Sequence, residues 1–116
     1  MKAVIHVDEM EKWTMGVGNL KRLIAYCQDA GQPFELELVA NGDAAPGVTA
    51  GTARELGLDE GLEAVLAQGA VVCVCQGAMK GSGIATEQLM AGVKIVPSGV
   101  CELVLRQQEG YAYVRP

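Results

Sequence analysis

The sequence has few of the residues on which several common functions depend. It contains one histidine, one tryptophan, three tyrosines and one phenylalanine, and its nine basic residues are scattered and outnumbered by fourteen acidic ones. A nucleic-acid-binding protein needs a clustered basic face, and a zinc site needs about four well-spaced ligands. We therefore expect no nucleic-acid partner, no metal and no cofactor.

Long apolar runs are also missing. No segment approaches the roughly 18 to 20 apolar residues of a membrane-spanning helix. The apolar run Ala3 to Ile5 is interrupted by His6 and Asp8, so it is too short and too polar for a signal peptide. We expect a cytoplasmic protein without a membrane partner, in which the four cysteines are free thiols.

The glycine-rich segments contain no complete nucleotide-binding motif. Gly16-Val17-Gly18 lacks the third glycine of G-x-G-x-x-G, and the segment 77–83, which contains Lys80, lacks the P-loop spacing. Both clusters indicate turns and close packing of the backbone.

Half of the residues are apolar, which is enough for a packed core, and the length predicts a single domain over residues 1–116. Apolar and β-branched runs predict strands, and helical periodicity predicts helices. The expected strands are 2–7, 34–40, 70–75, 93–96 and 111–114, and the expected helices are 13–30, 58–68 and 98–108, with short helical pieces after 76 and at 87–90. Residues 41–51 are rich in turn-forming residues and are expected to be a loop.

This alternation of strands and helices predicts an α/β fold with three layers, α/β/α, around a five-stranded, mostly parallel sheet. The order expected for such a sheet is the flavodoxin-like 2-1-3-4-5. Glu35 and Glu37 alternate with leucines, which predicts an edge position for the second strand. The uniformly apolar strand 70–75 is expected to be central and covered on both faces.

The best candidate for chemistry is Cys75. In open α/β sheets ligands bind beyond the carboxyl ends of the strands at the switch point, which for this order lies between strand one, ending near Asp8, and strand three, ending at Cys75. Cys75 also precedes a helix whose first N–H groups, in the turn Gln76-Gly77-Ala78, would lower the pKa of its thiol. The alternative interpretation is a small buried apolar residue.

Other residues near this crevice are less specific. His6 lies inside the first strand and is either a hydrogen-bonded core histidine or a crevice residue, and Lys80 is close enough in sequence to lower the Cys75 pKa further. Cys27 and Cys73 are expected in the core, and Cys101 is ambiguous.

The second half of the chain resembles proteins of the DsrE/DsrF-like family. The resemblance is carried by residues 75–80, Gly83-Ile84, 92–100 and 106–116, and more loosely in the first half by Trp13, Asn19 and Asn41-Gly42. It covers nearly the whole chain and implies a flavodoxin-like sheet and frequent trimers or hexamers. For the sulfur-relay members it also implies a persulfide on a cysteine at the end of strand three, the position of Cys75.

The leading hypothesis is a sulfur carrier, a sulfurtransferase-type protein without a full catalytic apparatus, that forms a persulfide on Cys75 and works as a homo-oligomer with sulfur donor and acceptor proteins. The alternative is a non-catalytic oligomeric module that binds a small anion or nucleotide-like ligand at helix N-termini. A third hypothesis is an oligomeric scaffold with Cys75 merely buried. Around Cys75, the expected crevice residues are His6, Asp8, Asn19, Asn41, Gln76, Gly77 and Lys80.

Overall fold

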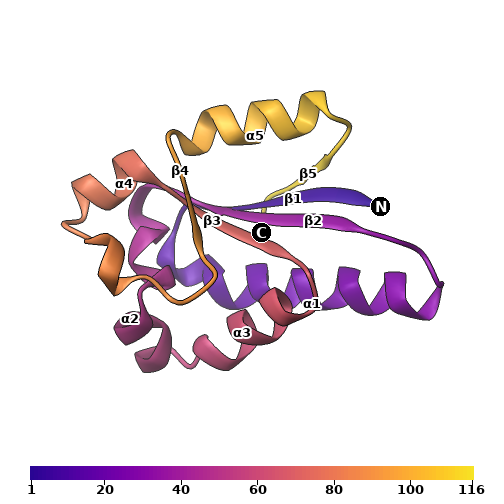
Figure 1. Ribbon diagram of the computed structural model, residues 1–116, viewed down its shortest axis with the longest axis horizontal. Helices are drawn as coiled ribbons and strands as arrows, with labels where there is room; N and C mark the ends of the chain where they lie inside the picture. Colours follow the sequence, from indigo (N-terminus) through magenta and orange to yellow (C-terminus); the bar gives the residue numbers. More distant parts are fainter.

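Five parallel strands form one sheet that has helices on both faces (Figure 1). The computed structural model describes residues 1–116. The strands are β1 (Lys2–Val7), β2 (Glu35–Ala40), β3 (Val71–Cys75), β4 (Lys94–Val96) and β5 (Ala112–Val114). The α/β/α class and all five predicted strands are confirmed.

The helices also follow the sequence pattern, with one exception. They are α1 (Trp13–Asp29), α2 (Ala50–Glu55), α3 (Asp59–Ala67), α4 (Gln76–Gly81) and α5 (Gly99–Gln108), with 3₁₀ segments η1 (Met10–Lys12), η2 (Gly42–Val48) and η3 (Thr86–Gln88). The prediction that residues 41–51 form a loop was wrong, because they contain η2 and the start of α2. The hydroxyl of Thr49 accepts a hydrogen bond from the backbone N–H of Thr52 and caps α2.

The strand order is 4-3-2-1-5, so the predicted order 2-1-3-4-5 was wrong. β2 lies between β1 and β3, and the predicted edge position of this strand was wrong as well. The alternation of Glu35 and Glu37 was misleading because Glu37 is buried, 3% exposed, under a helix that supplies a charge partner. β3 is buried along its middle, as predicted.

The strand order also explains how the helices divide between the two faces. From β1 to β4 the chain moves across the sheet in one direction, and it then returns to place β5 beside β1. Right-handed crossovers in opposite directions put their helices on opposite faces. Accordingly α5 covers one face alone, while α1 and α3 lie on the other (Figure 1).

The two faces differ in their packing. The α1 side holds a core cluster of 22 buried residues, whereas the α5 side holds only Val4, Val39, Cys73 and Leu103 in its buried cluster. The thinner side leaves room for polar groups between the sheet and α5. It is the side on which Glu37 pairs with Arg106 of α5.

Candidate functional site: a thiol at the end of β3

The end of β3 presents Cys75 between two helices. Cys75 has an extended backbone (φ −70°, ψ 125°) and is the N-cap of α4, which confirms that it precedes a helix. It is paired in register with Val96 at the end of β4, and its side chain is half-buried. This exposure argues against the hypothesis that Cys75 is merely buried.

The backbone around the sulfur favours the thiolate. Partial burial by itself raises the pKa of the Cys75 thiol. The backbone N–H groups of Ala78, Gly99 and Gly77 point to the sulfur and together lower the pKa by more, so the pKa lies below its ordinary value. Two of these groups belong to α4, as the sequence predicted. The third belongs to the first residue of α5, which the strand order brings over the end of β3.

Gly99 permits this close approach of α5. A Cβ atom added there would lie 2.9 Å from Cβ of Asn41 and 3.2 Å from Cβ of Cys75, so a larger residue would push the helix away. Ser98 fixes the start of α5, because its hydroxyl accepts a hydrogen bond from the N–H of Cys101. Asn41, Gly99 and Cys75 therefore meet at one point.

His6 is connected to this point through Asn41. The Nε2 atom of His6 lies 2.8 Å from Oδ1 of Asn41, and its Nδ1 atom lies 2.7 Å from the hydroxyl of Tyr113. The structure thus joins His6 and Asn41, two of the expected crevice residues. Sequence reasoning missed Tyr113 as a site residue, because only the pairing of β5 with β1 brings it to His6.

The remaining predicted residues are less closely involved. Gln76 and Gly77 are exposed in the first turn of α4, and Asp8 forms an ion pair of 3.0 Å with Arg115. Lys80 is exposed, and it is not among the causes of the Cys75 shift. Asn19 lies in the middle of α1, on the face of the sheet opposite to α5 (Figure 1).

The other cysteines have different surroundings. Cys27 and Cys73 are buried, as predicted, and Cys101 is exposed on α5. Burial raises the pKa of the Cys73 thiol, and the negative charges of Glu37 and Glu102 raise it further. Cys73 is therefore held as a neutral thiol two residues from Cys75.

A partly buried charge cluster lies between β2 and α5. Nε of Arg106 is 3.2 Å from Glu37 and 3.1 Å from Glu102. The pKa of Glu37 is raised to about 7. Burial is the largest cause, the hydrogen bond with Glu102 and its charge act in the same direction, and Arg106 opposes them. Sequence reasoning missed this cluster, although Glu102 and Arg106 have the i, i+4 spacing of a helical ion pair.

The same cluster contains the chain's potential metal ligands. Ligand atoms of Glu37, Cys73 and Glu102 lie within 4.8 Å of one another. However, the guanidinium of Arg106 already contacts both carboxylates, and a neutral thiol is a poor ligand. The arrangement therefore fits an arginine-neutralised carboxyl pair.

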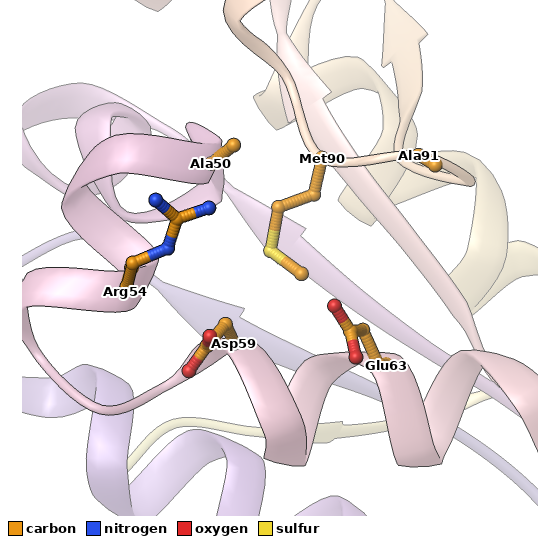
Figure 2. Close-up of a pocket in the computed structure, with 6 residues that line it drawn as sticks. All are labelled: Ala50, Arg54, Asp59, Glu63, Met90 and Ala91. Atoms are coloured by element: carbon orange, nitrogen blue, oxygen red, sulfur yellow. The ribbon is translucent and has the colours of Figure 1, made fainter.

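A hollow that none of these residues lines lies between α2, α3 and the segment at Met90 (Figure 2). It measures about 130 Å³, and Arg54 lines it together with Asp59 and Glu63. Because its lining combines positive and negative charges with the side chain of Met90, it does not favour one class of ligand.

The fold and the site together define a small three-layer α/β protein with a low-pKa thiol at the end of a parallel strand. The chain belongs to the DsrE/DsrF-like family, which matches it over residues 2–116. At the level of the family, this membership supports a sulfur-relay type of role. No curated protein matches the chain, and no helix is long and apolar enough to cross a membrane.

Solved structures similar to this chain share its architecture. MTH1491 of Methanobacterium thermoautotrophicum, a protein of unknown function, is 28% identical with a TM-score of 0.85, over 98% of this chain and 97% of that one. The ychN protein of E. coli is 22% identical (TM-score 0.72, all of both chains). BT1422 of Bacteroides thetaiotaomicron, also of unknown function, is 15% identical (TM-score 0.72, 99% and 94%). The last two similarities concern the fold alone.

Proposed function

We propose that this protein is a sulfur carrier in which Cys75 receives a sulfane sulfur as a persulfide and passes it to an acceptor. The observation that carries the proposal is the position of the Cys75 sulfur, half-exposed and facing backbone N–H groups from the first turns of two helices. A thiolate is the nucleophile in sulfur exchange. The family membership supports the same role.

The proposed step is an exchange without net oxidation. The Cys75 thiolate attacks the outer sulfur of a donor persulfide, a new S–S bond forms at Cys75, and the donor's own S–S bond breaks. The donor leaves as a thiolate with the electron pair of that bond. An acceptor thiolate then attacks the outer sulfur on Cys75 and regenerates the Cys75 thiolate. A donor protein supplies the persulfide and an acceptor protein supplies the second thiolate. The four free cysteines fit a reducing, cytoplasmic location.

We expect Cys75 to be alkylated faster than the other three cysteines at neutral pH, and to gain one sulfur atom from a low-molecular-weight persulfide. Cys101 is the informative comparison, because it is more exposed than Cys75, so exposure alone would make it the faster of the two. The measurement is alkylation at a series of pH values with peptide mapping, followed by intact mass after incubation with glutathione persulfide, with Cys75→Ser as the control.

Two results would count against the proposal. If Cys75 reacts no faster than the buried Cys27 or Cys73, the thiolate itself is refuted. If Cys75 reacts first but never gains sulfur, the thiolate stands and the sulfur-carrier assignment must be replaced by the binding of a small anion at the same N–H groups.

We also propose that the protein is a homo-oligomer. The outer side of α5 presents Val100, Val104 and Leu105 at 62%, 49% and 56% exposure, with the exposed Cys101 between them. Such an apolar stripe on a helix indicates a covered surface, and trimers or hexamers are the assemblies that the family resemblance implies.

Sedimentation at micromolar concentration is therefore expected to show a species larger than the 12.2 kDa chain. Replacing Val104 with aspartate should shift this species toward the monomer, whereas Lys94→Asp on the exposed part of β4 should not. A wild-type chain that sediments only as a monomer would refute the oligomer.

A further inference from the structure

The Asn41 side chain does not cap the helix that it precedes. Asn41 is the N-cap of η2, a position at which asparagine commonly accepts a hydrogen bond from the next turn, but its side chain makes no capping bond. Instead, Oδ1 faces Nε2 of His6. The side chain is thus held by another group and is turned toward the end of β3.

In the hydrogen bonds that link Tyr113, His6 and Asn41, the donor and the acceptor of each bond can be assigned. A carbonyl oxygen can only accept, so Nε2 of His6 donates to Oδ1 of Asn41. The Nδ1 atom of the neutral ring then accepts from the hydroxyl of Tyr113. With Oδ1 occupied in this way, the two N–H donors of the Asn41 amide face away from His6, on the side of Gly99.

Gly99 packs closely against both this amide and Cys75. The position that a Cβ of Gly99 would take is 3.1 Å from Nδ2 of Asn41 and 3.2 Å from Cβ of Cys75. Yet the groups that stabilise the Cys75 thiolate are all backbone N–H groups, and Asn41 is not one of them. The amide is therefore close to the cysteine without being a partner of the sulfur.

We propose that the Asn41 amide, oriented by His6 and Tyr113, donates a hydrogen bond to the outer sulfur of a Cys75 persulfide. A persulfide extends the side chain by one S–S bond of about 2.05 Å, which brings its outer sulfur within reach of an amide that lies this close to Cys75. The outer sulfur of a persulfide carries the negative charge when it is ionised, and a hydrogen bond to a charged acceptor is among the strong ones. Asn41 is then a positioning residue for the sulfur-loaded state, and this inference rests on the proposed function.

The test separates the loaded state from the free thiol. Wild type, Asn41→Ala, His6→Phe and Tyr113→Phe are equilibrated with defined ratios of glutathione persulfide to glutathione, and the sulfur-loaded fraction is measured by intact mass. Asn41→Ala should lower the equilibrium constant for loading about tenfold, and the other two variants should lower it less. The rate of alkylation of the unloaded Cys75 should change little in Asn41→Ala. Asn19→Ala, on the opposite face, is the matched control and should load as wild type does.

Each outcome has a distinct meaning. If wild type loads and Asn41→Ala loads equally well, the role of Asn41 is refuted while the sulfur carrier stands. A loss of alkylation as large as the loss of loading would show that Asn41 only maintains the local structure, and would overturn the inference too. Absence of sulfur on wild-type Cys75 would refute the proposed function and this inference with it.

Discussion

Replacing Trp13 with alanine is expected to lower the free energy of unfolding by about 3–5 kcal/mol, a large part of the roughly 5–15 kcal/mol available to a domain. Trp13 is 1% exposed, and its indole N–H donates a hydrogen bond of 2.9 Å to the carbonyl of Ala44 in η2. The substitution therefore leaves a cavity and removes the hydrogen bond between the indole and η2. Chemical denaturation followed by circular dichroism measures the loss.

A second variant tests the same contact from the other side. A Cβ atom on Gly47 would lie 2.1 Å from Nε1 of Trp13, so Gly47→Ala must displace the indole and break its bond to η2. Because Trp13 is the only tryptophan, its fluorescence should shift toward that of an exposed indole. Tyr26→Ala, at a side chain 61% exposed, is the control. If Trp13→Ala costs no more than this control, the anchoring role of Trp13 is wrong.

The stability of the protein is expected to fall as the pH rises from about 5 to 8, with Glu37 as a main cause. The pKa of Glu37 is raised to about 7 from 4.5, first by burial and then by Glu102. Because the folded state holds this proton more tightly than the unfolded chain, the contribution is complete below pH 4.5 and is lost as the pH rises through 7. It corresponds to up to about 3 kcal/mol.

Glu37→Gln should remove this part of the pH dependence. An amide of the same shape can accept from Arg106 and donate to Glu102 without ionising, so the variant should be more stable than wild type at pH 8. Glu35→Gln, on the same strand but exposed, is the control. Thermal or urea unfolding at several pH values gives the slopes, and equal slopes for wild type and Glu37→Gln would contradict the assignment.

The local pattern of the sequence was sufficient for the five strands and for the place of Cys75 at the end of β3. The uniformly apolar run before Cys75 and the turn chemistry after it predicted a buried strand followed by a helix, and both are present. These features depend on neighbours along the chain. The core position of Cys27 follows from helical periodicity, and that of Cys73 follows from the same apolar run.

The strand order could not be read from such patterns, because it depends on which strands find each other in space. The alternation around Glu37 has the same appearance for an exposed face and for a face under α5 with Arg106 opposite. The same limit hid Tyr113 and the N–H group of Gly99 from the predicted site. Both reach it through the return of the chain across the sheet after β4.

The pairing of β5 with β1 has a consequence for how the protein is made. Residues 3–5 pair with residues 112–114, and His6 and Tyr113 are 107 positions apart. Contacts of this separation form late and slow the folding of a domain. During synthesis, β1 emerges early and keeps one edge unpaired until β5 has been translated. The hydrogen bonds from Tyr113 through His6 to Asn41 can therefore form only after β5 has been translated, so the donor groups of Asn41 are oriented only in the finished protein.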